Sequence, residues 1–250
     1  QKGNVMIRKI LTGLALCLSP FAVADDHMPQ SAVVEVQECM LKEGASPFDV
    51  AAFGAEDFKQ FVADNDINVG AYLWEAVAVN PPFDEADFRW VMYYPTWDDY
   101  YKLRGEFLAK GAAMYAKFSA MASCGKSRFA STMPTGPSLE ISKEKPLIAA
   151  VCNLNEGMTM QDAMGFVPKA TALINTSMDT EISTFVWSNP VGVSGFDYLT
   201  IFTGETSAMT KMMNGVADGS LFQAFAKAGM APVAECDTNL HHSHLMVAPR

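Results

Sequence analysis

The chain has 250 residues, half of them hydrophobic, with 28 acidic and 18 basic side chains. This length and apolar content are enough for one large or two small packed cores. The formal net charge of −10 repels phosphate groups, so the composition argues against binding to nucleic acid or to an anionic membrane surface.

The first 24 residues have the pattern of a secretory signal peptide. Arg8 and Lys9 follow Met6, the expected start, an apolar run spans 10–18, and residues 22–24 have the small-x-small form of a signal-peptidase site. The run is shorter than the roughly 20 apolar residues of a membrane span. We therefore expect cleavage after residue 24, a mature chain without a membrane span, and a periplasmic or secreted protein. Cleavage would change the net charge from −10 to −13, because the segment holds three basic residues and no acid.

Four cysteines remain in the expected mature chain. An even number in an exported protein favours disulfide bonds, and four cysteines allow three pairings. The absence of a Cys-x-x-Cys motif argues against thioredoxin-type redox chemistry, zinc knuckles and covalent haem attachment. The four are Cys39, Cys124, Cys152 and Cys236.

A short pattern, Cys-x-Leu-x-Glu-Gly, occurs twice, at 39–44 and at 152–157. Nearly the same number of residues separates each copy from the next cysteine. Self-similarity at a fixed offset indicates that one unit was duplicated. We expect one copy over 31–133, a linker over 134–145 and a second copy over 146–250.

The elements of the first copy can be placed from their start signals. Ser46, followed by proline and then by Asp49, is typical of a helix N-terminus, and Thr96 with Asp99 gives a second one. Apolar patterns between these signals predict strands. We expect strands over 32–39, 69–79, 87–94 and 124–133, with helices over 46–65 and 96–123.

The second copy shows the same order of patterns. A helix begins at Thr159, and another over 206–229 is interrupted by Gly215 and Gly219. We expect its strands near 146–154, 181–191, 195–202 and 234–247.

Strand–helix–strand–strand–helix–strand is the order of the ferredoxin-like unit. Its sheet order, 4-1-3-2, brings the end of the first strand beside the start of the fourth. This topology predicts the bridges Cys39–Cys124 and Cys152–Cys236. The expected fold class is α+β, with two tandem ferredoxin-like repeats forming an α/β barrel and one internal disulfide in each repeat.

Two such units in one chain resemble the dimeric α/β-barrel superfamily in its fused form. The resemblance covers nearly all of the mature chain as an order of elements, without a family-specific motif. It implies two four-stranded sheets packed face to face, helices outside and a ligand cavity between the sheets. Members include small cofactor-free monooxygenases and haem enzymes related to chlorite dismutase. The haem enzymes hold iron through a histidine on a late helix. The helix at 206–229 has none, so we expect no haem.

The last predicted strand contains a candidate metal site. Alternation places His242, His244 and Met246 on one face and His241 on the other. Two imidazoles with one further donor can hold a metal ion, and mixed histidine and methionine donors suit copper. The alternative is a polar strand end with half-exposed histidines.

A second metal candidate depends on cleavage after residue 24. His27 would then be the third residue of the mature chain, where the free amine, two amide nitrogens and the imidazole can bind copper or nickel in a plane. The alternative is that histidine stands at this position by chance.

Aromatic residues of the predicted strands form a candidate pocket. Tyr72 shares a strand face with Trp74, and Trp90 shares one with Tyr94. If these faces line the cavity, they form a pocket for a small aromatic or hydrophobic molecule. The alternative is that the rings fill the interior. The candidate ligand-binding residues are Tyr72, Trp74, Trp90, Tyr94, Trp187 and Tyr198.

Glu35 is the candidate catalytic residue. It lies on the opposite strand face from Val34 and Val36. If the valines meet the helices, Glu35 and Gln37 point into the barrel, where a desolvated carboxylate could act as a base. The alternative is an exposed carboxylate at the rim.

The leading hypothesis is an exported binding protein for a small ligand or a metal, with its cavity between two sheets. The second is a cofactor-free or metal-assisted oxidoreductase of the monooxygenase type, in which Glu35 or a cavity histidine moves a proton. The third is a structural or partner-binding domain whose barrel is filled by side chains. The sequence defines neither the ligand nor an oligomeric state.

Overall fold

The structure is a computed structural model, and it describes residues 32–80, 85–138, 144–192 and 194–249. The expected signal peptide and His27 lie outside the described residues. Among the helices that the structure describes, none combines the length and the apolar character that a membrane span requires.

The first half of the chain follows the predicted order of elements, with three differences. The expected first helix contains a π-helical turn between α1 and α2. The expected second helix is divided at Gly111, and the expected fourth strand is divided by residues 125–127. The elements are β1 (Ala32–Leu41), α1 (Pro47–Phe53), the π-helical turn η1 (Gly54–Phe58), α2 (Lys59–Asp64), β2 (Gly70–Ala78), β3 (Phe88–Tyr94), α3 (Trp97–Lys110), α4 (Ala112–Met121), β4 (Ala122–Cys124) and β5 (Arg128–Pro134).

The second half also follows the predicted order. Its second helix is divided near Gly219, one of the two glycines expected to interrupt it. The elements are β6 (Glu144–Leu154), α5 (Met160–Met178), β7 (Ile182–Val191), β8 (Tyr198–Gly204), α6 (Thr206–Ala217), α7 (Ser220–Lys227) and β9 (Ala234–Val247).

Three helices begin at a capping box that the sequence signals indicated. In α1 the Ser46 hydroxyl accepts from the backbone N–H of Asp49, whose carboxylate accepts from the backbone N–H of Ser46. The same reciprocal arrangement opens α3 at Thr96 and α5 at Thr159. These bonds satisfy backbone donors that the first helical turn leaves unpaired.

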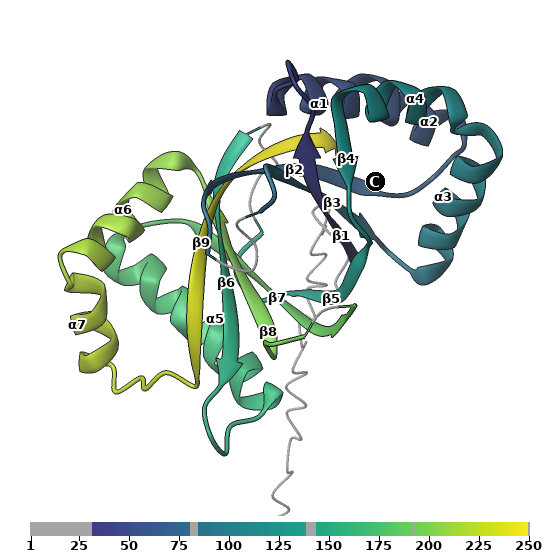
Figure 1. Ribbon diagram of the computed structural model, residues 1–250. Helices are drawn as coiled ribbons and strands as arrows, with labels where there is room; N and C mark the ends of the chain where they lie inside the picture. The colour runs from purple at the N-terminus through teal and green to yellow at the C-terminus, as the bar shows by residue number, and fades with distance from the viewer. Residues whose placement is uncertain (1–31, 81–84, 139–143, 193, 250) are drawn as a thin grey trace, which may run out of the picture.

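Eight strands form one closed antiparallel barrel, in the order β1-β3-β2-β9-β6-β8-β7-β5, and β4 pairs beside β1 (Figure 1). The strand order is β2-β3-β1-β5 in the first half and β7-β8-β6-β9 in the second. The halves are joined edge to edge, because β2 pairs with β9 and β5 pairs with β7. The expected pair of facing sheets is therefore a single barrel.

Helices cover the barrel on opposite sides: α1–α4 on one and α5–α7 on the other (Figure 1). Hydrophobic side chains form core clusters under both groups of helices and also in the barrel interior. Every residue of β3 is buried. Both faces of β3 are thus covered, one by helices and one by side chains of the barrel interior.

Both predicted disulfides are confirmed. Cys39 bonds to Cys124 and Cys152 bonds to Cys236, and in each case the two residues are direct partners on neighbouring strands. The Cα atoms lie 4.0 and 4.1 Å apart. Each bond stays within its own half, as the strand order predicted.

Candidate functional site

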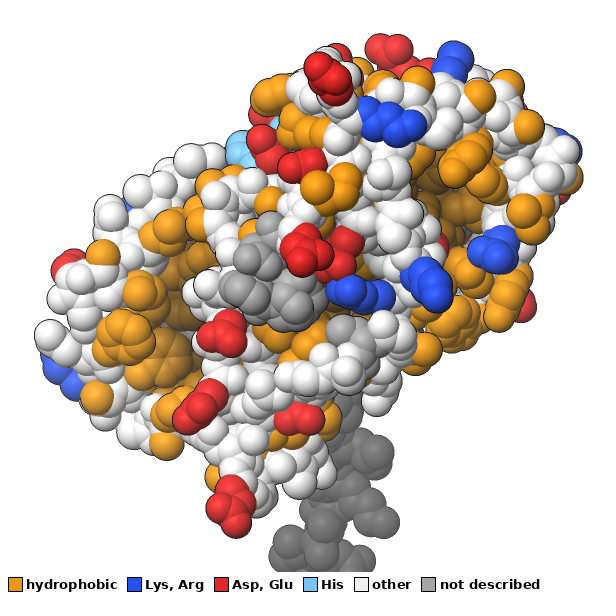
Figure 2. Space-filling view, viewed as in Figure 1, with side chains coloured by type: hydrophobic (Ala, Val, Ile, Leu, Met, Phe, Trp, Pro, Cys, Tyr) orange, Lys and Arg blue, Asp and Glu red, His pale blue; other side chains and the backbone are white. Residues whose placement is uncertain are grey.

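A large opening lies between the first half's sheet and its helices, and we call it the helix–sheet cavity. It has a volume of about 410 Å³. Figure 2 shows hydrophobic side chains gathered around a hollow beside α3 and α4. Its wall is mostly apolar and its rim is polar. The main lining residues are Glu35, Gln37, Phe53, Phe58, Trp90, Met92, Tyr94, Tyr100, Leu103, Arg104, Phe107, Met114 and Phe118.

Strand register decides which side chains face this cavity. Glu35 pairs with Met92 and Gln37 pairs with Trp90, and directly paired residues share a face. Val34 and Val36 are on the other face, inside the barrel. Glu35 was expected inside the barrel only if Val34 and Val36 met the helices. The structure shows the opposite arrangement: the valines face the barrel interior and Glu35 faces the helices.

Glu35 is the buried polar group of the helix–sheet cavity, with 4% of its surface exposed. The Tyr94 hydroxyl donates to its Oε2 at 2.8 Å. Its Oε1 accepts from the Ser127 hydroxyl and, at 3.4 Å, from Gln37 Nε2. Three donors thus orient one carboxylate at the apolar wall.

Two tyrosines next to Glu35 are held in the protonated form. Burial and the adjacent Glu35 carboxylate raise the pKa of Tyr94 well above its usual value. Burial and Glu35 also raise the pKa of Tyr100, while Arg104 opposes this change. A neutral Tyr94 hydroxyl can donate to Glu35, which an ionised one could not.

The six aromatic residues predicted to bind a ligand lie in three places. Trp90 and Tyr94 line the helix–sheet cavity. Tyr72 and Trp74 share the barrel interior with Trp187. Tyr198 packs under the helices of the second half. Alternation correctly placed Tyr72 and Trp74 on one strand face, and Trp90 and Tyr94 on one face of the next strand. These two faces lie on opposite sides of the sheet, because the direct partner of Trp90 on β2 is Leu73.

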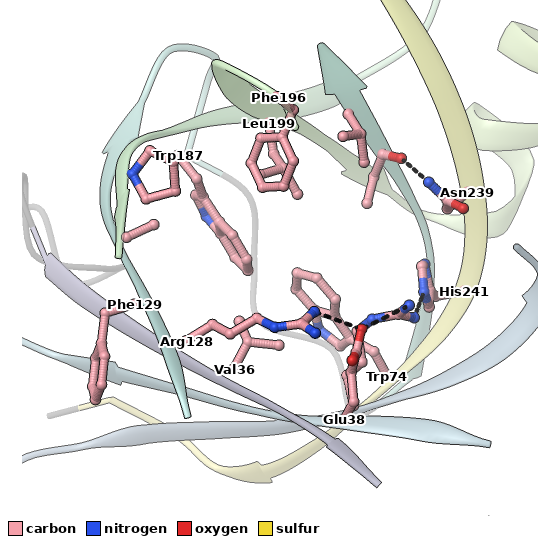
Figure 3. A pocket seen from close by; sticks show the side chains of 15 residues that line it. Val36, Glu38, Trp74, Arg128, Phe129, Trp187, Phe196, Leu199, Asn239 and His241 are labelled. Carbon is pink, nitrogen blue, oxygen red and sulfur yellow. Dashed lines mark hydrogen bonds and ion pairs between the residues drawn. The ribbon is translucent and has the colours of Figure 1, made fainter. Parts of the chain in front are cut away.

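The barrel interior is largely filled by rings (Figure 3). Trp74 stacks on Trp187 with ring centroids 5.1 Å apart. Tyr93 meets Trp187 edge-on. A cavity of about 70 Å³ remains, with Val36, Phe196 and Leu199 in its wall. The space that the superfamily resemblance placed between the sheets is therefore small.

Charged residues that the sequence analysis did not single out line the same barrel cavity. Arg128 Nη1 lies 2.8 Å from Glu38 Oε1, and Arg89 Nη2 lies 3.8 Å from it. Arg89 Nη1 lies 2.5 Å from Nε2 of His241. Figure 3 shows Arg128, Glu38 and His241 pointing into the cavity from three strands. Alternation along β1 could have indicated Glu38, which is four residues from Val34 and so on its face.

The tautomer of His241 follows from its partner. A guanidinium only donates, so Nε2 accepts and Nδ1 carries the proton. Burial, with the Arg89 charge, lowers the pKa of His241 from 6.5 to about 3. Within the described part of the chain, Trp74 Nε1 and Trp187 Nε1 have no hydrogen-bond acceptor. The remaining volume can hold several water molecules, which could accept from these donors.

His242 and His244 lie side by side on the outer face of β9, as alternation predicted, with ring centroids 4.9 Å apart. Glu75 of β2 and Glu144 of β6 lie next to them. Met246 is buried, and its sulfur lies against Gly54 of η1. Glu75 was missed because the sequence did not reveal that β2 of the first half pairs with β9. Glu144 was missed because it was assigned to the linker, whereas β6 begins at this residue and pairs with β9.

The fold and its cavities define a class, that of α+β barrels with a ligand-sized space beneath their helices. No model of a known protein family matches the chain, and no curated protein matches it either. Solved structures with this fold do match.

One of these structures is a variant of chlorite dismutase from Candidatus Nitrospira defluvii, with a TM-score of 0.51 and 10% identity over 89% of this chain and 96% of that one. Another is a putative chlorite dismutase, with a TM-score of 0.50 and 9% identity over 86% of this chain and 94% of that one. The superfamily that the sequence resembles includes relatives of chlorite dismutase, so the resemblance is confirmed at the level of fold. Identities this low show the fold alone.

Proposed function

We propose that the protein is an exported binding protein, which holds a small, largely hydrophobic molecule in the helix–sheet cavity. The observation that carries the proposal is a cavity of about 410 Å³ with an apolar wall and one buried, oriented carboxylate. Sites for small molecules are typically concave, mostly apolar and equipped with a few placed polar groups. Glu35 and Tyr94 are such groups.

The lining indicates the chemistry of the ligand. Phe53, Phe58 and Phe118 surround Trp90 with ring contacts of 5.3 to 6.3 Å, a wall suited to a ring or a branched chain. A carboxylate has about four acceptor positions, and the protein supplies three donors to Glu35. The remaining position suits a hydroxyl or amine of the ligand.

Export rests on two features that agree. The two disulfides are typical of proteins outside the reducing cytosol, and the N-terminal pattern is that of a signal peptide. The two halves have the same strand order and disulfides at equivalent positions, which also supports a tandem duplication. N-terminal sequencing of the protein from its producing cells should give Asp25 as the first residue. An intact N-terminus in a cytosolic fraction would contradict export.

The binding proposal is tested by mass spectrometry of small molecules released when the natively purified protein is denatured. A matched pair of variants gives the control. Met114 lines the cavity from α4, whereas Ala113 beside it is exposed. Met114→Trp should fill the cavity and abolish the bound molecule, and Ala113→Trp should keep it. An empty wild-type protein, or equal loading of both variants, would overturn the proposal.

An oxidoreductase acting in the same cavity is the second candidate. Its support is the Glu35 carboxylate, 2.8 Å from the Tyr94 hydroxyl, and the named structures are chlorite dismutases. The histidines of the described residues all lie on β9, and none lines this cavity. Glu35 would thus act without a histidine. Turnover separates the candidates, since an enzyme would convert the bound molecule and lose this activity in Glu35→Gln, while a binding protein would release the molecule unchanged.

Haem does not fit the residues present in the way that the superfamily resemblance implies. The helices α5, α6 and α7 carry no histidine. Hydrophobic side chains such as Val167, Met209 and Leu221 fill the space beneath them. We therefore assign no role to haem.

A further inference from the structure

Two histidines and two glutamates gather on the outer face of three adjacent strands, and we call them the His–Glu cluster. β9 lies between β2 and β6. His242 pairs with Glu75 on one side, and His244 pairs with Glu144 on the other. Direct partners share a face, so all four side chains project from the same side of the barrel. The cluster is separate from the helix–sheet cavity and does not depend on the proposed function.

Three members of the cluster have the spacing of metal ligands. His242 Nε2 lies 3.7 Å from Glu144 Oε2, and His244 Nδ1 lies 3.7 Å from Glu144 Oε1. One ligand atom from each of the three residues lies within 4.8 Å of the others. Donors in a tetrahedral zinc site, at about 2.0–2.1 Å from the metal, are separated by roughly 3.3 Å. Small side-chain rotations would bring these three atoms to that spacing.

Glu75 fixes the orientation of the central histidine. His244 Nε2 lies 3.2 Å from Glu75 Oε2, and the His244 side chain is only 5% exposed. An ionised carboxylate can only accept, so Nε2 carries a proton and donates it. The lone pair of a neutral His244 is then on Nδ1, the atom that faces Glu144. A carboxylate that holds the far nitrogen of a metal-binding histidine is a common arrangement, because it sets the tautomer and raises the basicity of the ligand atom.

This orientation creates an unfavourable contact that a cation would relieve. With Nε2 protonated, Nδ1 of neutral His244 and the Glu144 carboxylate present two acceptors to each other at 3.7 Å. Either a proton on Nδ1 or a metal ion between the two groups makes the contact favourable. His242 Nε2 lies near the other oxygen of Glu144 and adds a third possible metal ligand. A metal ion needs such additional ligands, whereas a proton shared by two groups does not.

We propose that His242 Nε2, His244 Nδ1 and the Glu144 carboxylate bind one divalent metal ion of the zinc class, with Glu75 as a positioning residue. The side chains of His242 and Glu144 are 39% and 57% exposed, so the ion can exchange with solvent and keep water in its remaining position. Met246 is not a ligand, since its sulfur packs against Gly54. Two nitrogens and a carboxylate, without a sulfur, replace the donor set that had suggested copper.

Isothermal titration of the chelator-treated mature protein with zinc chloride tests the site. We expect one zinc ion per chain. Glu144→Gln changes an exposed ligand and should weaken zinc binding at least tenfold, and the double variant His242→Ala/His244→Ala should abolish it. Glu156→Gln, an exposed acid beyond the other end of β6, is the matched control and should bind as the wild type does. Copper and nickel are titrated in parallel.

The positioning role of Glu75 has its own readout. Glu75→Gln should lower zinc affinity by about tenfold. Nitrogen-15 chemical shifts should also show His244 losing its single tautomer in the metal-free variant. A wild-type tautomer in that variant would remove the role assigned to Glu75.

Several outcomes would overturn the metal site. Failure of the wild type to bind zinc would do so, and so would unchanged binding in Glu144→Gln and in the double variant. Loss of binding in His27→Ala alone would assign the ion to the mature N-terminus instead. Non-reducing peptide maps and circular dichroism of each variant separate lost ligands from a lost fold. The ligand-release experiment on the helix–sheet cavity is independent of all these results.

Discussion

Trp74 and Trp187 stack inside the barrel, with ring centroids 5.1 Å apart and planes inclined by 20°. Trp74 comes from β2 and Trp187 from β7, so the contact joins the two halves of the chain across the interior. Both rings are at most 3% exposed. The stack is therefore a central part of the core that the halves share.

Removing one ring of this pair should destabilise the whole barrel. Trp187→Ala leaves a large hole among packed side chains, and we expect the free energy of unfolding to fall by about 3–5 kcal/mol. Chemical denaturation followed by circular dichroism measures this. Trp97→Ala is the control, since Trp97 is 46% exposed and should cost less. Equal losses in the two variants would contradict a central role for the stack.

The buried His241 predicts a pH-dependent stability. Its pKa is lowered from 6.5 to about 3 by burial and by Arg89, so between these values the unfolded chain binds a proton that the folded chain does not. The free energy of unfolding should therefore decrease as the pH falls through this window, by at most about 5 kcal/mol from this group. Above pH 6.5 the group should contribute no pH dependence.

His241→Gln tests this prediction, because the amide oxygen can still accept from Arg89 and does not titrate. The loss of stability between pH 7 and pH 4 should be smaller in this variant than in the wild type. His242→Gln, measured with chelator present, alters a more exposed ring and should keep most of the wild-type dependence. If His241→Gln responds to acid as the wild type does, the protonation of His241 is not the cause.

The hydrogen bond from Tyr94 to Glu35 should stabilise the wall of the helix–sheet cavity. Tyr94→Phe removes the donor and keeps the ring, so we expect a loss of about 1–2 kcal/mol in the free energy of unfolding. Tyr101→Phe removes the hydroxyl of a ring that is 63% exposed and should change stability little. Chemical denaturation of both variants at pH 7 compares their free energies of unfolding. An unchanged free energy of unfolding in Tyr94→Phe would show that this bond does not stabilise the protein.

Each disulfide should stabilise the chain separately. The bonds close segments of 85 and 84 residues, so replacing either pair by serine should lower the free energy of unfolding by about 2–5 kcal/mol. Thermal unfolding of the two paired variants gives the measurement. Peptide mapping without reductant checks the pairing, and a peptide linking Cys39 to Cys152 or Cys236 would contradict it.

Much of the fold could be predicted because its signals are local. Ser46, Thr96 and Thr159 each start a helix through bonds within three residues, and those bonds form in the structure. The cysteine pairing was predictable as well, since a strand order fixes which strand ends meet. The helix starts thus depend on local signals, and the cysteine pairing depends on the strand order within one half.

The candidate sites were harder to predict because they depend on strand pairing between the halves and on the direction of strand faces. Hydrophobic alternation could not tell which side of β1 faces the helices, since β3 beside it is buried on both faces. The side that Glu35 faces therefore stayed conditional in the sequence analysis, and the structure places it toward the helices. Glu75 meets His244 only because β2 pairs with β9 across the two halves, and Glu144 meets it because β6 begins within the segment that was expected to be a linker.

The closure of the barrel has a consequence for any attempt to divide the chain. A cut between Pro134 and Glu144 would leave β2 and β5 of the first fragment without their neighbours β9 and β7. In the second fragment, β9 and β7 would likewise lack β2 and β5. Bare strand edges bind other strands. Isolated fragments should therefore self-associate or reassemble with each other, and neither should persist as a monomer.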